Sequence, residues 1–329
     1  MNLTYTEEQE LFRKSIRDLA ADRVPAERLA EIADGEEGWD PALWKEAAGL
    51  GLAGISVSED HGGAGMGFIE EAIAAEELGR AVFPGPWLGS VILAQPALAE
   101  TPELLEAVAS GERIATFVPR GGHHVVDLAA ADLLVVDTEP GLIAAEKDDV
   151  EWRVLPTVDG TRRLGEVEVD GIGGRKLPGN TPAILEAIRV RGLAALASEA
   201  AGVAERVLEI AVEYAKERDQ FGKPIGAFQA VSHQLADTFM DVEMSKSLAL
   251  WAAAAIAEGD PERATAAETA KQYAADAAVR ACERAIQVHG GIGFTWEHVL
   301  HRYYKRALWI RAFLSSGDDL RANVASRLL

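Results

Sequence analysis

The sequence predicts a mainly α-helical protein with a small β domain in its middle. Two observations favour this fold class. Apolar residues recur at helical spacing toward both ends of the chain, and short β-type runs replace them in between. We therefore expect an N-terminal helical domain at residues 1–110, a reduced β domain at 111–178 and a C-terminal helical bundle at 179–329.

The N-terminal domain should open with an amphipathic helix. Thr6 and Gln9 have the spacing of a capping box, and Phe12 and Ile16 follow at helical intervals. The glycine-rich segment SEDHGGAGMG then predicts a loop ahead of a second helix at 70–78.

The middle of the chain changes to short runs that are typical of strands. They begin after Gly111 and contain β-branched and large apolar residues. The predicted strands lie at 115–118, 133–136, 150–155 and 164–169. Runs this short indicate a small sheet or a partial barrel.

Helical spacing returns at Pro182 and should stop near Arg218, because the segment QFGKPIG cannot continue a helix. A further break at 259–261 precedes an alanine-rich helix that ends at HGGIGF, and a last helix is expected at 296–313. The buried stripe expected on the second of these helices consists of Val231, Leu235, Phe239 and Val242. Four long helices with short connections indicate an antiparallel bundle.

Composition narrows the function classes. The net charge is −21, from 53 acidic and 32 basic residues, which disfavours nucleic acids and anionic membranes as partners. Cys282 is the single cysteine, so no internal disulfide can form, and no clustered metal ligands are expected. The N-terminal segment MNLTYTEEQE has no features of a signal peptide, and no apolar run is long enough for a membrane span. We expect a cytoplasmic protein.

Four segments look like motifs of one family. They are ALWKEAAGLGLAGISVSEDHGGAGMG, PTVDGTRRLGEVEVDG, ERDQFGKPIGAFQAVSHQLAD at 217–237 and QVHGGIGFTWEH at 287–298. Together, and in this order, they resemble the acyl-CoA dehydrogenase family over most of the chain. The resemblance implies the acyl-CoA dehydrogenase fold, FAD as cofactor, and a flavin site shared between two chains, to which a neighbour lends its two C-terminal loops.

The first lending loop contains residue types that suit a dinucleotide. Arg218 offers a planar fork of donors to pyrophosphate oxygens, and Phe221 can lie against the adenine. The amides of Gln220 and Gln229 can bond the adenosine part. Taken alone, Arg218 is better explained by a solvated cation near a helix C-terminus, and Phe221 by packing in a turn.

The second loop is marked by Gly290 and Gly291. Without side chains at these positions, backbone N–H groups can approach a phosphate, although a glycine that caps a helix is the structural alternative and both can hold. The cofactor-binding residues implied by the resemblance are Arg218, Gln220, Phe221, Gln229, Gln287, Val288, His289, Gly290 and Gly291.

Two departures from the family pattern concern the flavin ring and the catalytic base. The Thr-Glu-Pro, Gly-Ser-Asp and Trp-Ile-Thr segments of the usual middle domain are absent, and ATFVPRGGHHVVDLAAAD stands where the family has a longer stretch. Aligned on Arg306, the slot of the usual base glutamate falls at Ser315, and an alternative slot falls at Gly192. Leu193 stands where the family commonly has an arginine. Asp319 is the substitute base to consider, whereas Asp318 points elsewhere.

The resemblance therefore implies a base-lacking subunit of a heteromeric acyl-CoA dehydrogenase, expected to be α2β2, similar to the actinobacterial enzymes that act on steroid side-chain thioesters. The catalytic partner would supply the base and cover the flavin ring, acyl-CoA would be the substrate, and an electron-transfer flavoprotein would take the electrons. Alternatives are a self-sufficient enzyme with Asp319 or Glu70 as base, or a non-enzymatic scaffold. The cations Arg302, Lys305, Arg306 and Arg311 could face cofactor phosphates but are more typical of an exposed face.

Overall fold

The structure is a computed structural model and describes residues 4–329. The chain divides into two compact units, and three of the four boundaries between them fall inside helices. The first unit contains the chain up to Ala26 together with Ala72–Phe83 and Leu193–Leu329, and the second contains Glu27–Glu71 and Pro84–Gly192. The predicted class, mainly helical with a small sheet region, is confirmed. The three predicted domain boundaries stay a prediction.

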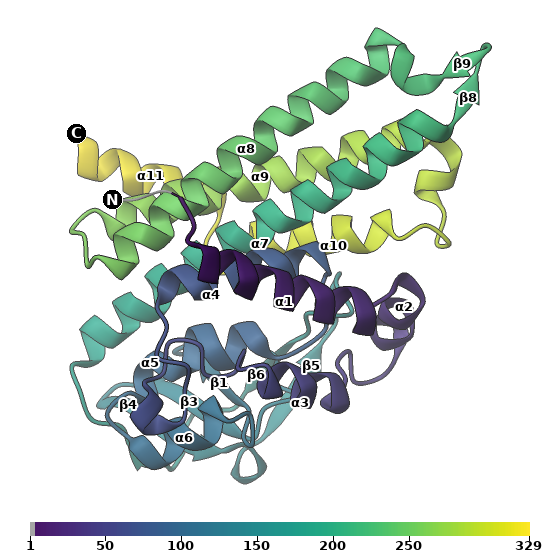
Figure 1. Ribbon diagram of the computed structural model, residues 1–329. Coiled ribbons are helices and arrows are strands. Elements are labelled where there is room, and N and C mark those ends of the chain that lie inside the picture. Colours follow the sequence, from purple (N-terminus) through teal and green to yellow (C-terminus); the bar gives the residue numbers. More distant parts are fainter. Residues whose placement is uncertain (1–3) are drawn as a thin grey trace. The chain divides into compact units, whose positions relative to one another are not determined.

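Long helices build the first unit (Figure 1). They are α1 (Glu7–Arg23), α4 (Phe68–Arg80), α7 (Thr181–Glu217), α8 (Gln229–Ala257), α9 (Arg263–His289), α10 (Leu300–Ala312) and α11 (Gly317–Leu328). The predicted capping box is confirmed, because the Thr6 hydroxyl accepts from the Gln9 backbone and the Gln9 side chain accepts from the Thr6 backbone. The predicted end of the helix near Arg218 and the break at 259–261 are also confirmed.

Two details of the predicted bundle are wrong. The last helix begins at Leu300, so Trp296 lies in the turn before it. Phe239, expected on a buried stripe, is 55% exposed. The small residues Thr238 and Ser245 share the buried face of α8 with Val242. Because neighbouring residues on a helix point about 100° apart, burial of Thr238 turns Phe239 away from that face.

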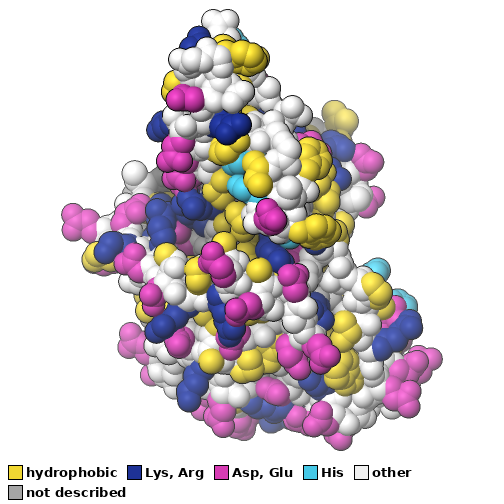
Figure 2. Space-filling view, turned by 90° about the vertical axis from the view of Figure 1, so that its right-hand side faces the viewer, with side chains coloured by type: hydrophobic (Ala, Val, Ile, Leu, Met, Phe, Trp, Pro, Cys, Tyr) yellow, Lys and Arg dark blue, Asp and Glu magenta, His cyan; other side chains and the backbone are white. Residues whose placement is uncertain are grey.

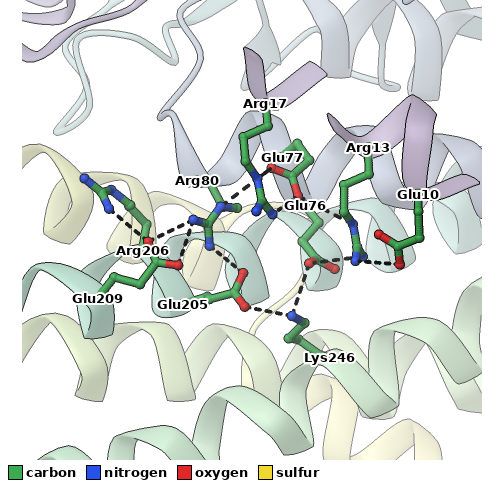
Figure 3. A network of polar contacts seen from close by, with 10 residues as sticks. All are labelled: Glu10, Arg13, Arg17, Glu76, Glu77, Arg80, Glu205, Arg206, Glu209 and Lys246. Carbon is green, nitrogen blue, oxygen red and sulfur yellow. Dashed lines mark hydrogen bonds and ion pairs between the residues drawn. The ribbon is translucent and has the colours of Figure 1, made fainter. Parts of the chain in front are cut away.

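An ion-pair network joins α1, α4, α7 and α8 within the first unit (Figure 3). Glu77 has no exposed side-chain surface and accepts two hydrogen bonds from Arg17, at 2.6 and 2.8 Å. Arg80 reaches Glu205 at 2.5 Å, and Lys246 bonds the other oxygen of Glu205 at 2.8 Å. The remaining members are Glu10, Arg13, Glu76, Arg206 and Glu209. Charges buried in this way require their partners, so the network ties the N-terminal helix to the bundle.

A second buried pair holds α10. Arg306 is fully buried and donates to Glu199 on α7 at 2.5 Å and to the carbonyl oxygen of Phe83 at 3.4 Å. The expectation that Arg306 belongs to an exposed basic face is therefore wrong, since its charge is neutralised inside the unit. Nearby, α4 and α7 approach so closely that a methyl group on Gly202 would overlap the carbonyl oxygen of Glu76.

The second unit combines short helices with two small sheets. Its helices are α2 (Ala26–Asp34), α3 (Pro41–Gly49), α5 (Gln95–Leu98), α6 (Pro102–Ala109) and a fully buried π-helix at Leu88–Ala94. Its strands are β1 (Ala115–Val118), β2 (Val125–Val126), β3 (Leu133–Thr138), β4 (Gly141–Glu146), β5 (Trp152–Leu155), β6 (Leu164–Val167) and β7 (Arg175–Lys176). Single 3₁₀ turns lie at Glu59–His61 and Lys147–Asp149 in this unit, and at Ile225–Ala227 and Gly290–Phe294 in the first.

The sheets have the order β1-β3-β4-β7 and β2-β6-β5. β1 and β3 pair in parallel, and every other pair in these two sheets is antiparallel. The predicted strands at 115–118, 133–136, 150–155 and 164–169 correspond to β1, β3, β5 and β6, whereas β2, β4 and β7 were not predicted. Among residues 4–329, no helix has the length and apolarity that crossing a bilayer demands.

Candidate functional site

The predicted cofactor residues lie at the ends of α7 and α9 in the first unit. After α7, a short hairpin of β8 (Asp219–Gln220) and β9 (Lys223–Pro224) leads into α8. Phe221 and Gly222 form its turn with φ values of 53° and 81°. Glycine tolerates this left-handed conformation, but a phenylalanine there is uncommon and costs free energy.

The side chains of this hairpin face solvent. Phe221 is 92% exposed and meets Phe228 only edge-on, at 6.1 Å between ring centroids. Arg218 and Gln229 are also exposed, and within residues 4–329 neither guanidinium nor amide has a side-chain hydrogen bond. The Gln220 amide donates to the carbonyl oxygen of Asp219. An unpaired guanidinium beside an exposed aromatic ring fits the phosphate and base of a dinucleotide.

The second loop presents backbone more than side chains. Val288 and His289 are buried, whereas Gln287, Gly290 and Gly291 are exposed. The N–H of Gly290, at φ 63°, donates to the carbonyl oxygens of Gln287 and Ile286, so this glycine caps α9. Open space surrounds the Cβ direction of both glycines. Gly290 thus caps the helix, as the structural alternative expected. Binding of a phosphate by this loop stays a prediction, and the open space beside both glycines is compatible with it.

A ring stack brings the two loops together. Tyr214, one turn before Arg218, stacks on His289 with ring centroids 4.2 Å apart, and its hydroxyl donates to the His289 carbonyl oxygen at 3.5 Å. His298 lies 4.6 Å from the His289 ring. Burial lowers the pKa of His289, and burial together with the neighbouring His289 lowers the pKa of His298. Both rings are therefore neutral at pH 7, and the positive charge at the site comes from Arg218 and from the lysines Lys223 and Lys305.

Aromatic side chains after the second loop add to the exposed surface. Phe294 is 79% and Trp296 is 76% exposed, and Lys305 holds its amine 4.5 Å from the Trp296 ring. Figure 2 shows hydrophobic and histidine side chains gathered in the upper part of its face, toward the β8–β9 end of the helices. Contiguous exposed apolar surface of this kind marks a place where a ligand or another chain binds.

The slot expected for the catalytic base holds no acid. Ser315 lies in the turn between α10 and α11, after Leu314 with φ 64°. Its carbonyl oxygen accepts from the buried amine of Lys271 at 2.7 Å, and the same amine donates to the carbonyl oxygen of Arg311 at 3.0 Å. Lys271 thus fixes the backbone of this turn, and the serine hydroxyl cannot replace a carboxylate as base.

The substitute acids are engaged elsewhere. Asp319 accepts from the Ser316 hydroxyl at 2.6 Å, while its own N–H donates to that hydroxyl, which is the arrangement of an N-cap. Asp318 pairs with Arg321 on the same helix. Glu70 accepts from the N–H of Gly67 at the start of α4.

Sequence reasoning missed two buried groups. Lys271 looks like one cation in an alanine-rich helix, and no spacing rule shows that it reaches two carbonyl groups. Glu71, in the second unit, is fully buried and pairs through both of its oxygens with Arg191, at 2.6 and 2.8 Å. Burial raises the pKa of Glu71. Arg191 precedes Gly192, the alternative base slot, which is itself buried, as is Leu193.

Comparisons with known proteins identify the family. The chain matches the family model described as the N-terminal domain of acyl-CoA dehydrogenase at residues 6–108, and that of the C-terminal domain at 191–329. It is 34% identical over 307 residues to acyl-CoA dehydrogenase IpdE2 of Mycolicibacterium smegmatis, covering 92% of this chain and 93% of the relative. This chain belongs to the acyl-CoA dehydrogenase family. The predicted oxidoreductase class and the FAD cofactor are confirmed by this membership.

Other relatives of this acyl-CoA dehydrogenase match over a similar length. IpdE2 of Mycobacterium tuberculosis is 33% identical over 334 residues, covering 99% of both chains. Among solved structures, a Tcur3481-Tcur3483 steroid ACAD has a TM-score of 0.88 and 29% identity, covering 97% of each chain. The ChsE4-ChsE5 complex from Mycobacterium tuberculosis has a TM-score of 0.89 and 26% identity, covering 100% and 99%. Butyryl-CoA dehydrogenase of Megasphaera elsdenii, at 22% identity and a TM-score of 0.88, shares the fold.

Proposed function

We propose that this chain is the base-lacking subunit of a heteromeric, FAD-dependent acyl-CoA dehydrogenase, and that it lends its two C-terminal loops to a flavin held by a catalytic partner. The expected assembly is α2β2. The expected reaction is α,β-dehydrogenation of an acyl-CoA, with steroid side-chain thioesters among the expected substrates and an electron-transfer flavoprotein as acceptor. We expect the complex in the cytoplasm.

The observation that carries this proposal is the state of the base slot. The carbonyl oxygens at the ends of the turn are bound by Lys271, and Ser315 offers only a hydroxyl. The Asp319 carboxylate accepts from the hydroxyl of Ser316, the N-cap of α11. An α-proton must leave to a carboxylate while FAD, when bound, accepts a hydride from the β-carbon. Since Ser315 has no carboxylate, and Asp318 and Asp319 are engaged in contacts within the start of α11, we infer that another chain supplies the base.

The exposed loops support the lending role. Arg218 would pair with the diphosphate, Phe221 would lie against the adenine, and Gln220 and Gln229 would bond the adenosine part. Gly291 would bring its backbone close to a phosphate. Most of these groups face outward without a partner in the described chain, the Gln220 amide with its bond to the Asp219 carbonyl oxygen being the exception, and outward-facing groups are what a shared site requires.

The heteromeric assembly is supported by the relatives. Two of the similar solved structures are named for pairs of proteins, ChsE4-ChsE5 and Tcur3481-Tcur3483, and the second is named a steroid ACAD. This chain matches them along nearly its whole length. The partner and the substrate class that we propose for this chain rest on this similarity.

Flavin counting on a co-expressed complex tests the proposal. The chain purified alone should be colourless, and co-expression with a full-length acyl-CoA dehydrogenase from the same gene cluster should give a yellow complex with one FAD per two chains. Arg218→Ala should reduce bound FAD in that complex, because the diphosphate loses its charge-assisted hydrogen bonds, an expected loss of about tenfold or more in affinity. Lys216→Ala, an exposed cation two residues away, is the matched control.

The outcomes separate the alternatives. One FAD per chain and turnover of an acyl-CoA by the isolated protein would establish a self-sufficient enzyme with an unconventional base. A stable complex whose flavin content and activity are unchanged by Arg218→Ala would instead favour a scaffold.

A further inference from the structure

A cleft in the second unit plays no part in the proposed function. It has a volume of 780 Å³ and is lined by residues of α3, of the segment after α6, and of the turn before β3. This volume falls within the range of roughly 300–1,000 Å³ that is usual for small-molecule sites. All of its lining residues belong to the second unit, so none of them is part of the loops at Arg218 and Gly290.

Two tryptophans on the wall of this cleft have indole N–H groups without an acceptor. Within residues 4–329, the Nε1 atoms of Trp39 and Trp44 are buried and make no hydrogen bond. Trp44 is 3% exposed, and a Cβ on the cleft residue Gly111 would lie 3.6 Å from its Nε1 atom. A buried indole N–H normally finds an acceptor, so two unsatisfied donors beside one cleft call for an oxygen that the chain does not supply.

The charged groups of the cleft point to a single negative charge on the ligand. Lys147 is engaged, since its amine donates to the carbonyl oxygen of Ala129 at 2.9 Å. Lys45 is exposed, and its amine has no hydrogen bond or ion pair in the described chain. Glu112 and Asp132 also line the cleft, and their charges disfavour a ligand that carries more than one negative group.

We propose that this cleft binds a flat, apolar monocarboxylate. Its ring system lies along the wall formed by Trp39 and Trp44. One carboxylate oxygen accepts from the Trp44 indole N–H, and the other accepts from the Lys45 amine. Aromatic side chains supply a large apolar contact area, and the charged hydrogen bond fixes the orientation of the ligand. The proposal assigns a second ligand site to the chain and does not depend on how FAD is shared.

Calorimetric titration of the full-length chain with 2-naphthoate, and with its neutral analogue 2-naphthamide, tests this site. Lys45→Met should lower the affinity for 2-naphthoate by about tenfold and leave the affinity for 2-naphthamide unchanged, because only the acid uses the charged hydrogen bond. Trp39→Leu should lower the affinity for both ligands by about three- to tenfold. Lys176→Met, an exposed lysine of the same unit, should change neither. Trp39→Phe keeps a ring at the site and should retain most of the binding. It therefore distinguishes loss of the ring from poor folding of the leucine variant.

Several results would overturn the proposal. Equal affinity of the wild-type chain for the acid and the amide would remove the role of the carboxylate. An unchanged affinity in Lys45→Met would do the same, and the absence of any binding heat would remove the site. Loss of binding in Trp296→Leu, with Trp39→Leu unaffected, would place the ligand on the exposed aromatic surface of the first unit.

Discussion

Replacing Lys271 with methionine should change how the stability of the protein depends on pH. The Lys271 side chain is 1% exposed and donates to the carbonyl oxygens of Arg311 and Ser315. Burial lowers the pKa of its amine to about 8, an effect that the charge of Asp276 opposes only in part. In the unfolded chain a lysine amine titrates near 10.4, roughly the value in model peptides.

The sign follows from the number of bound protons. Between about pH 8 and about pH 10.4 the folded protein has released the Lys271 proton while the unfolded chain still holds it, so the free energy of unfolding rises with pH. At about 1.4 kcal/mol per pH unit, the wild type gains about 3 kcal/mol across this window. The methionine variant lacks this titration. At about pH 7 the two proteins should differ less in free energy of unfolding. The variant loses two hydrogen bonds, which destabilises it, but it also loses a buried charge, which stabilises it.

Urea unfolding followed by circular dichroism, at several values from about pH 7 to about pH 10.5, measures this difference. Other groups that titrate in the window affect wild type and variant alike and cancel in the comparison. Lys176→Met, which removes an exposed lysine, should give a curve parallel to that of the wild type. Parallel curves for Lys271→Met as well would refute the reasoning, since they would show that the folded state holds the Lys271 proton as tightly as the unfolded chain does.

Two further substitutions test the packing of the first unit by thermal unfolding. Arg306→Met should lower the free energy of unfolding by about 3–5 kcal/mol, because it removes the guanidinium that pairs with the buried carboxylate of Glu199, and adding Glu199→Gln should recover part of this loss. An additive second loss would contradict the pairing. Gly202→Ala should cost about 3 kcal/mol or more through overlap with the carbonyl oxygen of Glu76, whereas Gly49→Ala, with no atom within 4 Å of the new methyl group, should be neutral or stabilising by up to about 1 kcal/mol. Equal effects of the two glycine substitutions would show that close helix approach does not constrain Gly202.

Local signals in the sequence predicted most of the elements, because those signals act over a few residues. The capping box at Thr6 and the break at 259–261 depend only on nearby chain chemistry, and both are present. β4 was missed because its run GLIAAE mixes alanine with glycine and carries little strand propensity. It forms through pairing with β3, which is a tertiary effect. The exposed Phe239 shows the same limit, since periodicity gives a stripe but not the face that a neighbouring helix covers.

The candidate site was predictable in its residue types more than in its contacts. The segment after Arg218 correctly predicted the end of α7 but not the β8–β9 hairpin. The stack of Tyr214 on His289, which joins the two loops, spans 75 residues and follows no spacing rule. The burial of Arg306 could not be predicted either. Its partner Glu199 lies 107 residues away, and nothing local distinguishes a buried arginine from an exposed one.

The positions of the buried charges explain how the chain can keep its fold while the loops of the proposed shared site stay exposed. The network around Glu77 and the pair of Arg306 with Glu199 connect helices through buried carboxylates and their arginine partners, so they favour one arrangement of the bundle. Phe221 and Trp296, in contrast, expose most of their rings and give the isolated chain little stability. Substitutions in these loops should therefore change flavin retention in the complex while leaving the thermal stability of the isolated chain nearly unchanged. That separation is what a subunit needs if it is to hold its own fold and lend a surface to a neighbour.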